Sequence, residues 1–130
     1  FKPITTEKVE EHVLDPEQFY ISKEVANLLT ERRKKGGRIV AVGTTVARAL
    51  ETQFRDGKYY SGSGYTDKYI YPPYEFRAID ALQTNFHLPR STLLALVYAF
   101  GGTELIKRAY NYAIEKKFRF YSYGDTMLIL

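Results

Sequence analysis

The sequence predicts one α/β domain, residues 1–130, built on a largely parallel sheet with an antiparallel strand pair at its C-terminal end. Three observations support this. Strand patterns alternate with helix patterns along most of the 130 residues. The run RIVAVG (residues 38–43) is almost entirely apolar, as strands covered on both faces of a parallel sheet are. Two β-rich segments flank a tight turn at Gly124 and Asp125, which predicts the antiparallel pair.

The first half of the chain is predicted to hold two strand-and-helix units. The expected elements are a short helix at residues 5–12, a strand at 16–21, a helix at 23–35, a strand at 38–43 and a helix at 44–54. Ser22 is suited to cap the helix that follows it. An apolar stripe of Val25, Leu28 and Leu29 should bury one side of that helix.

The second half is predicted to continue the alternation. The expected elements are a loop at 55–68, a short strand at 69–76, a strand at 80–88, a buried helix at 90–102, an amphipathic helix at 103–117 capped by Thr103, and strands at 118–123 and 126–130. In the strand at 80–88, alternation places Leu82, Thr84 and Phe86 on one face. It places Gln83, Asn85 and His87 on the other.

Composition narrows the possible chemistry. The sequence has no cysteine, which excludes disulfides, thiolate metal sites and a cysteine nucleophile. With only two histidines and no cysteine, no metal site is expected. No apolar run approaches the roughly 20 residues of a membrane span, and no secretory signal is present. We therefore expect no membrane partner and a cytoplasmic location.

The net charge of +4 favours an anionic partner, with nucleic acid first. A run of cations, Arg32, Arg33, Lys34 and Lys35, falls in the last turn of the predicted helix at 23–35. Cations there complement the helix dipole, which is one interpretation of the run. The other interpretation is that these side chains contact RNA phosphates.

Two strand-to-helix junctions share one design. One reads Gly43-Thr44-Thr45, and the other reads Pro89-Arg90-Ser91-Thr92. In open α/β sheets, ligands bind beyond the carboxyl ends of the strands, where helix N-termini offer free N–H groups. The alternative is that these hydroxyl residues are helix caps only.

Asn85 and His87 lie close to the second junction. A histidine can act as a general acid or base near neutral pH, and an asparagine can orient it or hold a substrate. The alternative is a solvent-facing polar strand face, or hydrogen bonds that fix a loop.

Three stretches resemble a known family: IVAVGTTVARALE (residues 39–51), IYPPYEFRAIDALQTNFHLPRSTLLALVYAFGG (residues 70–102) and FRFYSYGDTMLIL (residues 118–130). They are similar to the C-terminal portion of S-adenosylmethionine:tRNA ribosyltransferase-isomerases of queuosine biosynthesis. The similarity runs in order from Phe1 to Leu130, and the motif TNFHLP-x-STLL is its most specific part.

The resemblance implies a transferase. Such enzymes transfer and isomerise the ribosyl moiety of S-adenosylmethionine onto 7-aminomethyl-7-deazaguanine in tRNA. The product is epoxyqueuosine, and adenine and methionine are released. S-adenosylmethionine is then a substrate, no metal is required, tRNA binds through its anticodon loop, and a monomer without an obligate protein partner is expected.

The resemblance also implies a three-layer α/β sandwich and a separate β-barrel domain that this chain lacks. Because the chain begins with Phe1 rather than Met, we expect it to be a fragment of a larger two-domain enzyme. Part of any active site would then lie outside it, and the fragment alone is not expected to carry the full activity.

Combining motif and pattern gives a site hypothesis. One wall would consist of Gly43, Thr44, Thr45 and Arg48, and the other of Asn85, His87, Arg90, Ser91 and Thr92. His87 would transfer a proton with Asn85 beside it, and residues 32–35 would contact RNA. The competing hypotheses are a non-catalytic tRNA- or nucleotide-binding module and an interaction domain without a ligand.

Overall fold

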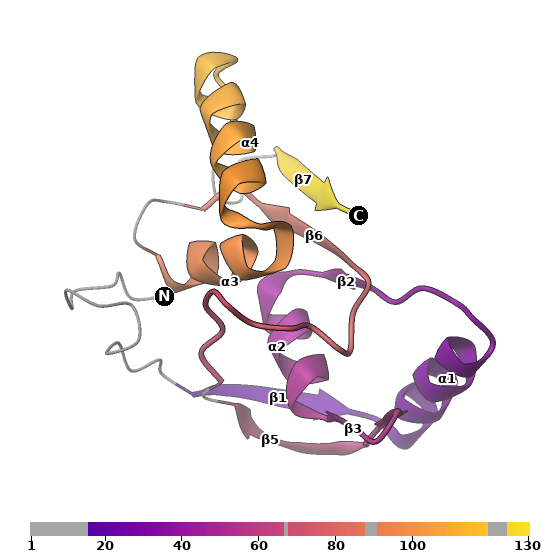
Figure 1. The fold of residues 1–130 in the computed structure, drawn as a ribbon. Helices are drawn as coiled ribbons and strands as arrows, with labels where there is room; N and C mark the ends of the chain where they lie inside the picture. Colours follow the sequence, from indigo (N-terminus) through magenta and orange to yellow (C-terminus); the bar gives the residue numbers. More distant parts are fainter. Residues whose placement is uncertain (1–15, 67, 88–90, 120–124) are drawn as a thin grey trace.

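A computed structural model describes residues 16–66, 68–87, 91–119 and 125–130 (Figure 1). Its strands form three sheets, ordered β1-β5, β2-β6-β7 and β3-β4. The α/β class predicted from the sequence is confirmed. The helix predicted at residues 5–12 lies outside the described residues. That all 130 residues form one domain remains a prediction.

The first strand and helix form as the sequence predicts. Strand β1 (Glu17–Ile21) pairs antiparallel with β5 (Gly62–Thr66). Helix α1 (Lys23–Lys34) begins at Ser22, whose Oγ accepts a hydrogen bond from the backbone N–H of Val25 at 3.1 Å.

The predicted buried stripe of α1 is confirmed only in part, since Leu29 is partly buried against the hydrophobic core. Ala26 is the buried residue of this helix, whereas Val25 and Leu28 are 46% and 52% exposed. Val25 and Leu29 also line an apolar groove of about 640 Å³ between α1, β1, β2 and α2. Because this groove is open to solvent, helical spacing alone did not ensure burial.

The central sheet positions the candidate site. Strand β2 (Val40–Val42) pairs parallel with β6 (Ala81–Asn85), and β7 (Thr126–Ile129) pairs antiparallel with the other edge of β6. The expectation of a largely parallel sheet is therefore wrong, because β2–β6 is the single parallel pair among the four described pairs.

The order of the elements explains the direction of β7. Two helices, α3 (Thr92–Gly101) and α4 (Thr103–Glu115), separate β6 from β7. The C-terminal half of α4 lies beside the finishing end of β6, where the Tyr110 hydroxyl accepts a hydrogen bond from the His87 backbone N–H. The chain therefore enters β7 at that end and runs back along β6.

One face of the central sheet is buried and the other is open. Ala41 and Leu82 are fully buried on the inner face. Val42, Gln83 and Leu128 lie in register on the opposite face, where Val42 and Leu128 are 63% and 56% exposed. We call these three residues and Val40 the open sheet face. Strand β2 is thus not covered on both faces, and a three-layer sandwich remains an expectation.

The predicted loop at 55–68 contains regular structure. Strands β3 (Phe54–Arg55) and β4 (Lys58–Tyr59) form a hairpin around Asp56 and Gly57. These two residues have φ of 53° and 78°, the left-handed values that a tight hairpin turn requires.

The strand predicted at 69–76 is absent. Pro72 and Pro73 offer no N–H for strand pairing. The segment is held instead by the buried Glu51 carboxylate, which accepts hydrogen bonds from the Tyr74 hydroxyl at 2.9 Å and the Ala78 N–H at 2.6 Å.

The remaining helices follow the prediction with small shifts. Helix α2 (Thr44–Thr52) follows β2, and α3 is buried along most of its length. Gly102, with φ of 86°, caps α4 in place of the predicted Thr103. No helix in the described ranges is long and apolar enough to cross a membrane.

The predicted C-terminal strand pair is only partly tested. Residues 120–123 of its first strand lie outside the described residues, while Phe118 and Arg119 are not in a strand. Strand β7 is antiparallel as expected, but in the described part of the chain its partner is β6.

Candidate functional site

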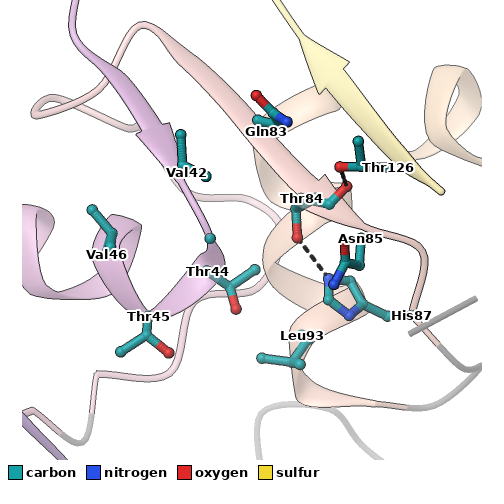
Figure 2. Close-up of a pocket in the computed structure, with 11 residues that line it drawn as sticks. Val42, Thr44, Thr45, Val46, Gln83, Thr84, Asn85, His87, Leu93 and Thr126 are labelled. Carbon is teal, nitrogen blue, oxygen red and sulfur yellow. Dashed lines mark hydrogen bonds between the residues drawn. The ribbon is translucent and has the colours of Figure 1, made fainter. Parts of the chain in front are cut away.

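A pocket of about 520 Å³ lies where β2 and β6 end. The two strands finish side by side because they are parallel and in register, with Val42 opposite Gln83. The backbone N–H of Gly43 then donates to the carbonyl of Gln83 at 2.8 Å, which fixes the junction with α2 against β6. Figure 2 shows Thr44 and Thr45 on one side of this pocket and Thr84, Asn85 and His87 on the other.

Gly43 shapes the first wall of the pocket. Its φ of 100° lies in a region that favours glycine, and it serves as the N-cap of α2 without a side-chain hydrogen bond. The first N–H groups of a helix have no partner within the helix. At α2 they therefore remain available, with the positive end of the helix dipole, to a polar or anionic group in the pocket.

Thr44 adds a second donor at the same place. Its side chain is 6% exposed and lines the pocket, and within the described part of the chain its hydroxyl has no hydrogen-bond partner. In Figure 2 this hydroxyl points away from the body of α2. This hydroxyl is not among the buried polar atoms that lack a partner, so it is accessible from the pocket and can donate to or accept from a ligand group.

Thr45 lines the pocket with a hydroxyl that is already bonded. Its Oγ1 donates to Glu17 Oε2 at 2.9 Å. The other oxygen of Glu17 lies 2.5 Å from Nη1 of Arg48. Arg48 therefore does not line the pocket as predicted. It is almost fully buried and donates also to the carbonyl of Thr66 at 3.3 Å.

His87 forms the second wall but not in the way that alternation predicted. Strand β6 ends at Asn85, so His87 does not share a strand face with it. The ring instead turns toward Thr84, whose Oγ1 lies 2.9 Å from Nε2, and both side chains are buried (Figure 2).

Burial sets the protonation state of His87. Desolvation by burial lowers the pKa of its imidazole to about 4, because the charged form loses its hydration. The ring is therefore neutral at pH 7. Burial also raises the pKa of Tyr110 to about 12, so its hydroxyl keeps its proton beside the His87 backbone.

Asn85 and Thr126 complete the mouth of the pocket. Asn85 is exposed, and within the described ranges its side chain has no hydrogen-bond partner. Thr126 lies opposite it in the β6–β7 register and donates through Oγ1 to the Thr84 carbonyl at 2.6 Å. None of the described lining residues carries a charge at pH 7, so the pocket binds through hydrogen bonds, and the start of α2 supplies its positive potential.

The second predicted junction contributes less than expected. Ser91 caps α3, with its Oγ accepting from the Leu94 N–H at 3.1 Å. Thr92 is buried with an unpaired hydroxyl but does not line the pocket, whereas Leu93 does. Arg90 lies outside the described residues.

The predicted RNA-binding run lies at the other end of the strands. Arg33 forms an ion pair with Asp80 at 3.0 Å and donates to the Arg77 carbonyl at 2.7 Å. Asp80 also accepts from the Ile39 N–H just before β2, so this cluster marks the starting edge of β2 and β6. Arg33 is therefore a structural residue. The other three cations, Arg32, Lys34 and Lys35, are exposed.

Several residues that line or support the pocket were not predicted from the sequence. Thr84 was placed on the strand face of Leu82 and Phe86, and that face is buried, but the pocket reaches Thr84 where β6 ends. Thr126 and Glu17 gave no signal, since each depends on the pairing or contact of segments distant in sequence.

Comparisons with known proteins agree on one family. The model of the family described as queuosine biosynthesis protein matches residues 1–129. A relative from Aquifex aeolicus named S-adenosylmethionine:tRNA ribosyltransferase-isomerase is 56% identical over 130 residues, which is 100% of this chain and 38% of the relative. A relative of the same name from Thermoanaerobacter sp. (strain X514) is 53% identical, with the same two coverages.

A solved structure shows the same arrangement. The crystal structure of S-adenosylmethionine tRNA ribosyltransferase from Thermotoga maritima matches with a TM-score of 0.82 and 52% identity, over 87% of this chain and 40% of that one. The chain thus spans about 38% of the length of the curated relatives it matches.

Proposed function

The chain belongs to the queuosine biosynthesis protein family, and on this premise we propose that it carries part of the active site of an S-adenosylmethionine:tRNA ribosyltransferase-isomerase. The observation that carries the proposal is the pocket itself. The family motifs around Gly43 and around His87 meet there across paired strands. The reaction is the transfer and isomerisation of the ribosyl group onto 7-aminomethyl-7-deazaguanine in tRNA, with adenine and methionine released and epoxyqueuosine formed.

The α2 wall is assigned to S-adenosylmethionine. That substrate carries one carboxylate, and the free N–H groups at the start of α2 and the Thr44 hydroxyl are suited to bind an anion. Thr45 is held in place by Glu17, and Arg48 holds Glu17. Arg48 therefore acts as a positioning residue. A substrate contact for Arg90, Ser91 and Thr92 is not required by this assignment.

His87 is assigned to proton transfer, with Asn85 bonding the substrate at the pocket mouth. The sulfonium of S-adenosylmethionine acidifies the adjacent ribose carbon, so a base must accept that proton. A neutral imidazole can accept it, although a pKa near 4 makes the ring a weak base. A bound anion beside the ring would raise this pKa toward the range in which a general base works best.

The proposal includes a cytoplasmic, monomeric enzyme that uses no metal and binds the tRNA anticodon loop. It is tested in a protein of the relatives' full length that contains this chain, called below the full-length enzyme. Incubation with S-adenosylmethionine and tRNA bearing the precursor base should release adenine and methionine and leave epoxyqueuosine in the tRNA. Calorimetry with each substrate separates the alternatives. Binding of tRNA without S-adenosylmethionine favours the non-catalytic module, and binding of neither leaves an interaction domain.

A further inference from the structure

The C-terminal half of α4 presents an exposed surface of cations and aromatic rings beside the pocket. We call it the α4 patch. It consists of Arg108, Tyr112, Lys116, Lys117, Phe118 and Arg119. In Figure 1 this end of α4 projects beyond the central sheet, on the far side of the molecule from α1. We propose that the α4 patch binds the single-stranded RNA that flanks the reacting base, which rests on the proposed tRNA substrate.

The patch is organised by helical spacing. Arg108, Tyr112 and Lys116 follow one another at intervals of four residues, so they lie on one face of α4. The Lys116 ammonium lies 5.8 Å from the centroid of the Tyr112 ring. Lys117 adopts φ of 60°, which ends the helix and places Phe118 beside this face.

The two aromatic rings of the patch are exposed to solvent. Tyr112 is 56% exposed and Phe118 is 40% exposed. Phe118 meets the edge of Tyr112 at 6.0 Å and the buried Phe86 at 5.9 Å, so the pair is supported from beneath and held in place. Unpaired RNA bases stack on such rings, and cations alongside bind the phosphates.

The charges favour a polyanion. In the described part of the chain, no carboxylate pairs with Arg108, Lys116 or Lys117. Three carboxylates do lie close: Glu104 is exposed one turn before Arg108, Glu115 is exposed beside Lys116, and Asp125 lies 3.3 Å from the Arg119 guanidinium. The Arg119 side chain is still 66% exposed. The four cations thus outnumber the three carboxylates, and Asp125 is already bound to Arg119.

The patch and the pocket share a supporting framework. Phe86 precedes His87 directly, and Tyr110 of α4 bonds the His87 backbone. On the other side, Arg119 holds Asp125, the residue before the pocket-lining Thr126. An RNA loop held on the patch would therefore have its neighbouring base within reach of the pocket, whereas residues 32–35 lie at the opposite edge of the strands.

The test uses the full-length enzyme and an anticodon stem-loop RNA carrying the precursor base. Lys116→Gln with Lys117→Gln should lower the slope of log affinity against log salt by about 0.7 for each phosphate that the protein no longer binds. Tyr112→Leu should weaken binding of the stem-loop about tenfold and leave binding of a blunt RNA duplex of equal length nearly unchanged. The matched control is Lys23→Gln, which replaces an exposed lysine at the start of α1. It should change neither the salt slope nor the affinity for the stem-loop.

The outcomes separate this inference from the proposed function. If the wild-type enzyme neither binds the stem-loop nor converts its substrates, both the proposed function and the inference about the α4 patch fail. If the wild-type enzyme binds the stem-loop and converts its substrates, and the lysine variants keep the wild-type affinity and salt slope, the α4 patch is not an RNA surface. If Tyr112→Leu lowers the melting temperature and leaves RNA binding unchanged, the patch packs against protein and the inference is wrong. Affinity for S-adenosylmethionine should stay at the wild-type value in every patch variant.

Discussion

The Nε2 atom of His87 lies 2.9 Å from Oγ1 of Thr84, and both side chains are buried where β6 ends. A threonine hydroxyl can donate to a neutral imidazole or accept from it, so it orients the ring in either tautomer. Unlike a carboxylate, it cannot compensate the positive charge of a protonated ring. This pairing therefore fixes the orientation of His87 without making it more basic.

The neutral state of His87 predicts a pH dependence of stability. Its folded pKa of about 4 lies below the ordinary value of 6.5, so between these values the unfolded chain binds more protons. Stability should therefore fall as pH drops from about 6.5 to about 4, by up to about 3 kcal/mol for this residue. Urea unfolding of the full-length enzyme across this range measures it. His87→Gln should show a shallower loss, and equal losses in both proteins would mean that the ring is not buried in its neutral form.

Removing the Thr44 hydroxyl should affect substrate binding more than folding. Thr44→Val keeps the shape of the side chain and breaks no hydrogen bond in the described structure, so stability should change by less than about 0.5 kcal/mol. Affinity for S-adenosylmethionine should fall about fivefold to tenfold, as expected when one hydrogen bond is removed.

Thr52→Val is the matched control for this prediction. The Thr52 hydroxyl donates to the Arg48 carbonyl at 2.8 Å and lies 2.8 Å from that of Thr66, outside the pocket. Its loss should lower stability and leave the affinity for S-adenosylmethionine unchanged. Calorimetry and thermal melts of both variants provide the comparison, and equal affinities in wild type and Thr44→Val would remove Thr44 from the site.

Glu17 should matter for stability because it is the charge partner of a buried arginine. Glu17→Gln leaves the guanidinium of Arg48 without a counter-charge, which should cost about 2 kcal/mol. This is less than for a fully buried pair, because the Glu17 side chain is 27% exposed. A double-mutant cycle with Arg48→Met should show coupling of at least about 1 kcal/mol, and additive effects would contradict the role of the pair.

The cationic run at 32–35 should divide into one structural residue and three exposed ones. Arg33→Gln removes the contacts to Asp80 and the Arg77 carbonyl and should lower stability by about 1 to 2 kcal/mol. Arg32→Gln should leave stability unchanged. If Arg32 contacts a tRNA phosphate, its replacement should reduce the salt dependence of binding by about 0.7 to 0.9 in log–log slope. An unchanged slope would assign Arg32 to the solvated end of α1.

Local sequence signals predicted much of the fold. Ser22 caps the helix after it as expected, because capping depends on residues three positions apart, and Ser91 caps α3, which was the alternative to its predicted place in the site. The junction at Gly43 was also predicted, since a glycine between an apolar strand and a helix pattern is a local signal. The turn at Asp56 and Gly57 carried an equally local signal for a hairpin, and the prediction of a loop there missed it.

The features that the sequence did not predict depend on contacts between distant segments of the chain. Motif and pattern placed Arg48 on a wall of the site, but its guanidinium is buried against Glu17, 31 residues away, and does not line the pocket. Strand alternation predicted an outward His87, but β6 ends two residues before it. The position of Thr126 follows from the antiparallel pairing of β6 and β7, which two intervening helices determine.

The open sheet face has a consequence for handling the protein. Val42, Gln83 and Leu128 form one continuous row, and β2 is the edge strand of its sheet in the described structure. Exposed Val42 and Leu128 side chains next to an unpaired backbone edge are a template for adding strands from other chains. When expressed alone at high concentration, this chain should precipitate or bind hydrophobic dyes. A charged residue in place of Val42, such as lysine, should improve its solubility.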